Sequence, residues 1–583
     1  MLFSYDRSVS LVRPAFLRPL LFARTVAAVL VLISASCASV VPASGTVDVQ
    51  LLAINDFHGA LEPPAGSNGR IGQVTAGGVE YLASHLAALA ATNANSVIVS
   101  AGDNIGATPL LSGMFHDEPS IEALSTAGLA LSAVGNHELD EGWDELYRIQ
   151  KGGCHPVDGC QDRTPFKGAT FRYLTANVLV DPANATKQML DRSGWKPSSG
   201  RQPAPLFPPY TIRQFNGVRI GFIGLTLQSV GTIVSPIAMK GLIVRPEAEA
   251  ANEIARTLRN QGVHAIVVLI HEGGVPKGAA GQEDPNGCED FQGAIVNIAK
   301  QMSPDIDVIV SGHTHRAYVC TLDTKLVTSA SSFSRVITDI DLQIDRQTGR
   351  VIAKSAHNVV VTREVPKHPG ETALIEHYRP LAESVAGKPV GTASATIAAT
   401  RNGAGESALG DIIADGMLDA ARAVAGRVDA AFTNSGGIRS DLIASGANST
   451  ITFSDLFNVL PFGNTVMVKT LSGDAIIRLL EQQTPVRVLQ VSSTFRYAWD
   501  PAKPAGSRVN RGSIQIDGKP LVATEKYRIA TVDFVWNGGD DFTVATEGTE
   551  AVTVGTDVDV FRTYVGKQSP VTAGPQDRIR LDR

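Results

Sequence analysis

The chain has 583 residues, of which 44% are hydrophobic and 19% are charged, and its formal net charge is -6. This length indicates a globular protein of two to four domains, with ample chain to bury large cores. A protein that binds nucleic acid usually carries an excess of basic residues, so the acidic balance argues against a polymeric nucleic-acid partner.

The first 44 residues have the pattern of an export signal. Arginines between residues 7 and 24 precede an apolar run at 26–33, and small residues surround Cys37. This order is typical of a secretory signal, and the run is shorter than the roughly 20 residues of a membrane span. We therefore expect residues 1–44 to be a signal peptide and the mature protein to be periplasmic or extracellular. A buried N-terminal helix is the alternative, and Cys37 is a candidate lipid-acceptor cysteine.

The cysteine pattern agrees with export. Besides Cys37 the chain has four cysteines, of which Cys154 and Cys160 enclose the short segment CHPVDGC. An even set in an exported protein indicates disulfides, and we expect the pairs Cys154–Cys160 and Cys288–Cys320. A cysteine metal site is the alternative, although the spacing lacks paired CxxC motifs.

Short aliphatic runs recur along the N-terminal half, and each of five ends in a polar cluster. These runs are VDVQLLAIND, SVIVSAGD, LSAVGNHE, HAIVVLIHEGG and DVIVSGHTH. Near-continuous Val, Ile and Leu runs predict strands buried on both faces, and the intervening pattern at 247–261 predicts a helix. Strands that alternate with helices predict an α/β fold, whose ligands gather beyond the carboxyl ends of the strands.

A change of composition divides the chain. The pattern of the N-terminal domain, expected over 45–365, breaks at TREVPKHPGE, and residues 366–388 are expected to form a linker with a helix at 372–385. The second domain is expected over 389–583 and opens with a predicted helix at 408–425.

The five polar clusters share side chains that bind divalent metals. Asp56 and His58 alternate on a segment expected to be extended, so both could point to the same side. Asp103 could bridge two cations, because a carboxylate has two oxygens. The other candidate ligands follow the remaining strands: Asn136, His271, His313 and His315. Such mixed ligands suit Zn, Mn, Co or similar ions, and two adjacent metals could hold both the attacking and the leaving oxygen of a displacement.

The ordered set NDFHG, GDN, GNHE, HEGG and GHTH resembles the calcineurin-type metallophosphoesterase signature. Its NDFHG and GNHELDEG segments are most similar to the 5′-nucleotidase family of secreted and periplasmic enzymes. That resemblance implies a four-layer α/β/β/α N-terminal domain around a dinuclear metal centre.

The resemblance also implies roles for the candidate residues. One metal would be held by Asp56, His58, Asp103 and His315, and the other by Asp103, Asn136, His271 and His313. His315 stands where nearer relatives often carry Gln or Asn, so the metal identity stays open. His137 and Asp140 resemble the catalytic pair, in which His137 contacts the phosphoryl group and Asp140 orients it and favours its cationic form. A third metal ligand is the alternative role for His137.

The C-terminal segment resembles the nucleotide-binding domain of the same family. The implied substrate residues are Arg401, Asn434, Arg439, Phe462, Phe534 and Asp540. The two phenylalanines would sandwich the base, the arginines would bind phosphate or ribose oxygens, and Asp540 would bind ribose hydroxyls. Arg401 departs from the family spacing. The alternative is that both phenylalanines belong to the core and that the Gly-rich loops are turns.

These features together predict a 5′-nucleotidase that releases phosphate from nucleoside 5′-monophosphates in nucleotide catabolism and salvage. Two divalent metal ions would activate water and neutralise phosphoryl oxygens. The site is expected between the domains, with rotation about the helix at 372–385. UDP-sugars, dinucleotides or 2′,3′-cyclic nucleotides are alternative substrates. A thiosulfonate hydrolase and a non-catalytic nucleotide-binding protein are further alternatives, and the oligomeric state is open.

Overall fold

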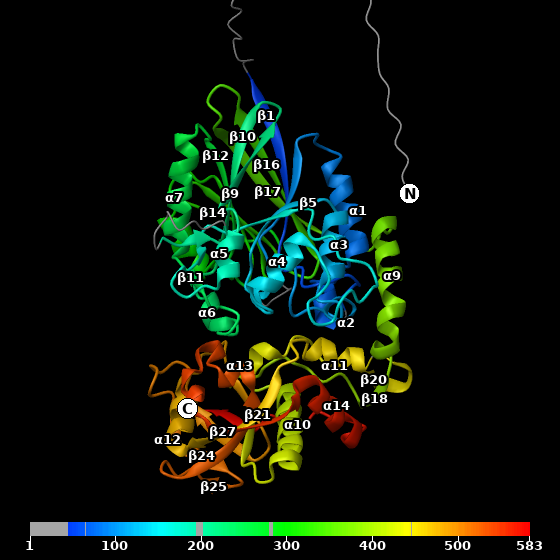
Figure 1. Ribbon diagram of the computed structural model, residues 1–583, viewed down its shortest axis with the longest axis vertical. Coiled ribbons are helices and arrows are strands. Elements are labelled where there is room, and N and C mark those ends of the chain that lie inside the picture. Colours follow the sequence, from blue (N-terminus) through cyan, green and yellow to red (C-terminus); the bar gives the residue numbers. More distant parts are fainter. Residues whose placement is uncertain (1–44, 65, 194–201, 279–283, 445, 583) are drawn as a thin grey trace, which may run out of the picture. The chain divides into compact units, whose positions relative to one another are not determined.

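The computed structural model describes residues 45–64, 66–193, 202–278, 284–444 and 446–582 (Figure 1). The expected signal peptide and Cys37 lie outside the described residues. None of the described helices is both long and apolar enough to cross a membrane.

Two six-stranded sheets form the centre of the N-terminal domain. The first has the order β17 (Val351–Val360), β16 (Val336–Asp345), β1 (Thr46–Ile54), β4 (Ser96–Ser100), β5 (Leu129–Ala133) and β6 (Arg172–Leu174). The second has the order β14 (Ala317–Leu322), β15 (Lys325–Ala330), β13 (Val308–Ser311), β12 (Ala265–His271), β10 (Val218–Thr226) and β9 (Tyr210–Phe215). Strands β1, β4, β5 and β6 are parallel, as are β10, β12, β13 and β15. The carboxyl ends of the parallel strands therefore meet at one edge of each sheet.

Alternating side chains place these sheets in the middle of four layers. Leu51 and Ala53 of β1 belong to the same core cluster as Val267 and Leu269 of β12, which lies between the two sheets. Leu52 points the other way, into the core shared with the helices that cover the first sheet. These helices are α1 (Val79–Ala90), α3 (Glu118–Thr126) and α4 (Trp143–Lys151). Helices α7 (Glu247–Asn260) and α8 (Ala294–Gln301) cover the second sheet, so the α/β/β/α arrangement is confirmed.

A separate core organises the C-terminal domain. Its five-stranded sheet has the order β22 (Leu489–Val491), β19 (Ala430–Asn434), β26 (Lys526–Val532), β21 (Thr465–Ser472) and β27 (Thr549–Thr556). Its longer helices are α10 (Ala408–Ala425), α12 (Gly473–Glu481) and α14 (Asp557–Gln568), and a four-stranded sheet comprises β25 (Lys519–Pro520), β24 (Val509–Ile516), β23 (Phe495–Trp499) and β28 (Ile579–Leu581). The residues predicted to form a helix at 408–425 coincide with α10.

Short elements complete the described chain. In the N-terminal domain these are β2 (Arg70–Ile71), β3 (Val74–Thr75), α2 (Leu110–Gly113), β7 (Val178–Val180), α5 (Lys187–Ser193), β8 (Ala204–Pro205), α6 (Val230–Ile233) and β11 (Leu242–Val244). In the C-terminal domain they are β18 (Pro389–Thr392), β20 (Thr450–Thr452), α11 (Phe453–Val459) and α13 (Asp533–Trp536).

Helix α9 (Pro369–Ala386) joins the two domains and covers the residues predicted to be helical at 372–385. Its Ile375 and Tyr378 belong to the core of the N-terminal domain, where the ring of Tyr378 lies 4.9 Å from that of Phe115. The helix is therefore anchored to the N-terminal domain, and the chain leaves it at Gly387, shortly before β18.

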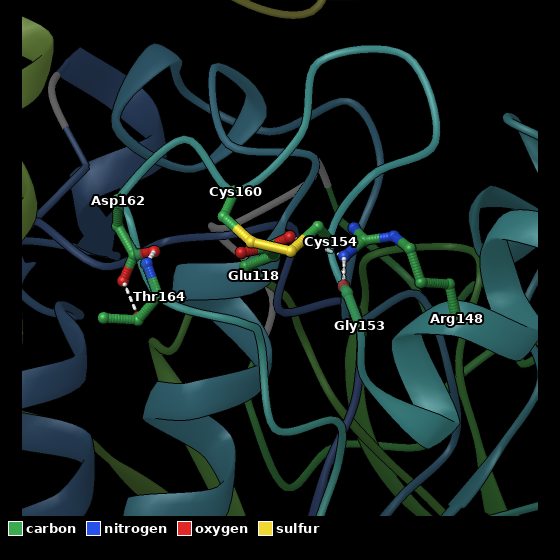
Figure 2. Close-up of a disulfide and its surroundings, with 7 residues drawn as sticks. All are labelled: Glu118, Arg148, Gly153, Cys154, Cys160, Asp162 and Thr164. Atoms are coloured by element: carbon green, nitrogen blue, oxygen red, sulfur yellow. Dashed lines mark hydrogen bonds and ion pairs between the residues drawn. A yellow bond between two sulfur atoms is a disulfide. The ribbon is translucent and has the colours of Figure 1, made fainter.

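Both predicted disulfides are present, Cys154–Cys160 and Cys288–Cys320. The first closes the loop that follows α4 (Figure 2). Beside it, the guanidinium of Arg148 donates to the carbonyl oxygen of Gly153 at 2.8 Å and to Glu118 at 2.5 Å. The start of the loop is thus held against α3.

Candidate metal centre and substrate-binding residues

The first candidate ligands follow β1, but the segment that carries them is not extended. Asp56 and His58 have φ angles of 49° and 46°, in the left-handed region. The expectation that they alternate on a strand is therefore wrong. The chain turns after Ile54 and runs along the loop after β4, since the amide of His58 donates to the carbonyl oxygen of Asp103 at 3.1 Å. The two side chains still meet, with His58 Nε2 at 3.9 Å from Asp56 Oδ1.

The ligands expected for the first metal lie together. His315 Nε2 is 3.2 Å from Asp56 Oδ1 and 3.1 Å from His58 Nε2. His58 Nε2 also lies 3.7 Å from Asp103 Oδ2. Neighbouring donors around an ion with bonds of about 2.0–2.2 Å are separated by roughly 3 Å, so these four side chains fit one divalent cation.

The ligands expected for the second metal gather on the other side of Asp103. His271 Nε2 lies 2.9 Å from Asp103 Oδ2 and 3.1 Å from Asn136 Oδ1. His313 Nδ1 lies 3.0 Å from the same oxygen of Asn136. The Asp103 carboxylate therefore faces both sets, as a bridging ligand must. The backbone is left-handed at three more of these positions, with φ of 52° at Asp103, 71° at His313 and 55° at His315.

Backbone carbonyls orient two of the imidazoles. His271 Nδ1 bonds the carbonyl oxygen of Ala101 at 2.9 Å, and His58 Nδ1 bonds that of Gly106 at 2.8 Å. Each bond places the ring proton on Nδ1 and leaves Nε2 as a lone-pair donor toward the centre. Burial raises the pKa of Asp56, but His315 and His271 together outweigh it and hold that pKa at about 2. The buried carboxylates are thus stabilised by positive charge on neighbouring imidazoles, and bound cations would supply that charge in their place.

Glu138 ties the two ligand loops together, a role that the sequence analysis missed. Its buried carboxylate accepts from the backbone amides of Asp103 at 2.9 Å, Asn104 at 2.8 Å and Gly135 at 2.6 Å. Burial and then Asp103 raise the pKa of Glu138 to about 7, although these amide bonds favour the charged form. The only signal in the sequence was a glutamate two residues after a candidate ligand, in GNHE.

His137 and Asp140 form the pair that was expected. His137 Nδ1 lies 2.6 Å from Asp140 Oδ2, and the amide of His137 donates to Asp103 Oδ1 at 2.9 Å. Burial lowers the pKa of His137, but Asp140 and Asp103 outweigh it and raise the pKa above its usual value. Nitrogen and oxygen donors of His58, Asp103 and His137 also lie within 4.8 Å of one another, so the geometry accommodates both expected roles of His137.

Two of the expected substrate residues reach this pair. The ring of Phe462 is stacked on that of His137, with centroids 5.7 Å apart and an interplanar angle of 18°. The guanidinium carbon of Arg439 lies 5.8 Å from the centroid of the Phe462 ring. An aromatic ring and a guanidinium of the C-terminal domain are therefore brought to the metal-ligand cluster.

Three other substrate candidates form a second group within the C-terminal domain. Asn434 Nδ2 donates to Asp540 Oδ2 at 2.9 Å. The ring of Phe534 lies on Gly539, where a Cβ atom would come within 2.5 Å of it. Among the described residues, Arg401 has no hydrogen bond or ion pair with either group. Its guanidinium donates instead to the carbonyl oxygens of Pro485 at 3.3 Å and Val486 at 3.2 Å.

A cavity of about 310 Å³ adjoins the metal ligands, lined in part by His58, Phe333, Arg439 and Asn458. The Phe333 ring lies 5.6 Å from that of His58 and 5.3 Å from that of His315. Phe333 has a φ of 57°, which is unusual for a bulky residue and typical of functional sites. No motif in the sequence had indicated this residue.

Comparisons with known proteins agree with the fold. Residues 49–317 match the calcineurin-like phosphoesterase family, and residues 389–547 match the C-terminal domain of 5′-nucleotidases. Endonuclease YhcR of Bacillus subtilis is 30% identical over 545 residues, covering 92% of this chain and 41% of that protein. Cell wall protein Lmo0130 of Listeria monocytogenes is 30% identical over 559 residues, covering 90% of this chain and 68% of that protein. The chain thus spans about two fifths of the length of the Bacillus relative.

A solved structure extends the comparison. A 5′-nucleotidase precursor from Thermus thermophilus superposes with a TM-score of 0.71 at 27% identity, covering 92% of this chain and 99% of that one. The fold and the ligand clusters define a metal-dependent phosphoester hydrolase of the calcineurin-like class. Within that class, the chain belongs to the 5′-nucleotidase family.

Proposed function

We propose that this protein is a 5′-nucleotidase that releases inorganic phosphate from nucleoside 5′-monophosphates. The observation that carries the proposal is the stacking of Phe462 on His137 beside the metal ligands, with the guanidinium of Arg439 next to the Phe462 ring. An aromatic face stacks on any base, and a guanidinium fork suits phosphate oxygens, so one substrate could occupy both groups. The pair Asn434 and Asp540 offers amide and carboxylate groups suited to ribose hydroxyls.

In this proposal the two ligand sets that share Asp103 hold two divalent cations, of zinc, manganese, cobalt or a similar metal. Cations held there would lower the pKa of a bound water and neutralise charge on the phosphoryl oxygens. The side chain of Glu138 holds the loops of both ligand sets together, because its carboxylate accepts from the backbone amides of Asp103 and Gly135.

His137 and Arg439 supply the positive charge that comes from the protein. The carboxylate of Asp140 accepts a hydrogen bond from Nδ1–H of His137. The Nε2–H group of the same ring is then directed to donate to a phosphoryl oxygen. Charge on these oxygens grows as the water oxygen bonds to phosphorus and the bond to the 5′ oxygen breaks. The 5′ oxygen of the nucleoside takes up a proton that the attacking water gives up, and phosphate is the second product.

The substrate class is tested by phosphate release from AMP, UMP, UDP-glucose, NAD and 2′,3′-cyclic AMP with Zn²⁺, Mn²⁺, Co²⁺ or Mg²⁺ supplied. A single-stranded oligonucleotide is included because one relative is named an endonuclease. We expect the nucleoside monophosphates to be hydrolysed fastest. Preferential hydrolysis of a diphosphate, cyclic or polymeric substrate would replace the proposal, and no activity on any of them would refute it.

A paired variant separates nucleotide recognition from phosphate chemistry. Phe462→Ala should raise KM for AMP by about 5- to 150-fold, because stacking on a base contributes about 1–3 kcal/mol. The same variant should hydrolyse p-nitrophenyl phosphate, which has no base, with a nearly unchanged kcat. Equal losses of kcat/KM for AMP and for p-nitrophenyl phosphate would show that Phe462 acts on His137 and not on the base.

We also propose that the protein is exported, to the periplasm or the cell exterior, with Cys37 as a candidate lipid anchor. The two disulfides and the relative named a cell wall protein support this assignment. Cell fractionation with a cytoplasmic marker enzyme tests it, and recovery of the protein with that marker would exclude export.

A further inference from the structure

A histidine outside the metal centre lies against the turn that carries Asp140. His116 follows α2, and its Nδ1 lies 3.2 Å from Glu141 Oε2, while its Nε2 lies 2.8 Å from Asp158 Oδ2. Glu141 directly follows Asp140 in the chain, and Asp158 lies in the loop closed by Cys154–Cys160. One imidazole therefore joins the turn after Asp140 to the disulfide loop.

The partners of His116 define its charge. Both are carboxylates, and an ionised carboxylate only accepts hydrogen bonds, so both ring nitrogens of His116 must carry a proton. Burial lowers the pKa of His116, but Glu141 and then Asp158 and Glu145 outweigh it and raise that pKa to about 9. His116 is therefore an imidazolium at neutral pH.

A neutral imidazole covers one face of this cation. The ring of His155 is stacked on that of His116, with centroids 3.6 Å apart and an interplanar angle of 12°. His155 Nδ1 accepts from the backbone amide of Asp158 at 3.2 Å, and burial, then the charge of His116, lowers the pKa of His155. The side chains of His116 and His155 are only 18% and 12% exposed, so salt screens the bridge less than it screens an ion pair on the open surface.

The residue after His116 supports the same turn from a second side. Asp117 Oδ2 accepts from the amide of Gly106 at 3.0 Å. A Cβ atom at Gly106 would lie 2.7 Å from His137 Cβ and 2.9 Å from Asp140 Oδ2, so this glycine packs directly against both side chains. The segment after α2 thus reaches the pair along two routes, through this glycine and through the ion pairs of His116.

We propose that His116 is a positioning residue for the pair His137 and Asp140. Its bonds to Glu141 and Asp158 hold the turn after Asp140 against the disulfide loop. Asp140 in turn fixes Nδ1 of His137, so the direction in which His137 Nε2 points depends on this turn. The inference rests on the role proposed for His137 in phosphate release.

Steady-state kinetics of His116→Gln test the proposal, because glutamine is uncharged and has its donors on a single nitrogen. A displacement of about 1 Å at a reacting group can lower a rate about 100-fold, so we expect kcat to fall about 10- to 100-fold. KM and metal content should stay at the wild-type values, because His116 contacts neither the metal ligands nor Phe462. An unchanged kcat, or loss of metal together with activity, would overturn the proposal.

The control and the substrate keep this test independent of other errors. His357→Gln makes the same change at an exposed position of β17 and should keep the wild-type kcat. The assay uses whichever phosphoester the wild type hydrolyses fastest. An error in the proposed substrate class therefore leaves the comparison intact.

A permanent cation separates positioning from a general effect on folding. In His116→Arg the guanidinium stays charged, donates to carboxylates through a fork and stacks on a ring, so kcat at pH 7 should recover toward the wild-type value. The wild type loses its imidazolium as pH rises through about 9. The ratio of kcat in His116→Arg to kcat in the wild type should therefore rise about 5- to 10-fold between pH 7 and pH 10. Parallel pH profiles, or no recovery at pH 7, would contradict the proposal.

Two further measurements locate the effect. If His116 acts through Glu141, the double variant His116→Gln/Glu141→Gln should lose no more kcat than the more impaired single variant, whereas losses that multiply would contradict this route. Nitrogen-15 NMR of histidine-labelled protein reports the charge of His116 without any turnover, with its signals assigned from their absence in His116→Gln. Both ring nitrogens should carry protons at pH 7, and a neutral ring would overturn the bridge whatever the protein hydrolyses.

Discussion

The hydrogen bonds of Glu138 make the substitution Glu138→Gln a sharp test of how the metal-ligand loops are held. One oxygen accepts from the amides of Asp103 and Gly135, and the other accepts from the amide and the side chain of Asn104. Glutamine has the same shape but only one acceptor oxygen. In either orientation its NH₂ group faces two N–H donors, which then remain buried without an acceptor.

Each buried donor that loses its acceptor destabilises the fold by about 1–3 kcal/mol, so the variant should lose about 2–6 kcal/mol. At about 2 °C per kcal/mol for a domain of this size, Tm should fall by about 4–12 °C. The loops that carry Asp103 and Asn136 should also loosen, with metal affinity lowered by about 10- to 100-fold.

Differential scanning calorimetry and metal analysis check both effects in Glu138→Gln. The control is Glu376→Gln, the same change at an exposed position of α9, which should leave Tm and metal content unchanged. If Glu138→Gln melts within 1 °C of the wild type and keeps its metal, the carboxylate does not hold the loops and the reasoning fails.

Three further predictions concern the bridging ligand, a buried carboxyl and a close-packed glycine. Asp103→Ala should lose both metals and phosphate release together, as measured by metal analysis and by AMP hydrolysis; a fully active variant would refute the bridging assignment. Glu371 is fully buried with no hydrogen-bond partner among the described residues, and burial, then Glu80, raises its pKa to about 8. Because the folded pKa lies above the unfolded value, this group's contribution to stability is complete below about pH 4.5 and is lost as pH rises through about 8. The Tm of the wild type should therefore fall more between pH 7 and 9 than that of Glu371→Gln, and parallel curves would contradict this. Gly539→Ala places a Cβ atom within 2.5 Å of the Phe534 ring and should raise KM for AMP about 5- to 150-fold. Gly574→Ala, which has open space around it, should leave KM unchanged. An unchanged KM in Gly539→Ala would remove Phe534 from base binding.

The periodic features of the sequence predicted most of the fold. Continuous aliphatic runs identified β1, β4, β5, β12 and β13, because strands buried on both faces need apolar side chains at every position. The helices α7 and α10 were also predicted to within a residue at each end. Parallel strands place their carboxyl ends at one edge, so the candidate ligands of the five clusters were correctly expected to meet.

The local conformation of the ligands could not be predicted in the same way. Nothing in NDFHG indicates that Asp56 and His58 adopt left-handed turns, because that conformation is set by hydrogen bonds to the loop after β4. Glu138 and Phe333 were missed for a related reason. Their contacts join segments far apart in the chain, as in the approach of Phe333 to His315, and no spacing rule within one motif describes them. The contacts of Arg401 with the carbonyl oxygens of Pro485 and Val486 were likewise invisible in the sequence.

The left-handed ligand positions have a consequence for anyone who engineers this protein. A side chain in that conformation is disfavoured by about 1–2 kcal/mol relative to glycine, and five of the seven candidate ligands adopt it. Substitution of glycine at these turns would relax the backbone, so a screen that rewards heat resistance alone will favour variants that have lost the catalytic centre. Directed evolution of a more durable form must therefore select for turnover in every round.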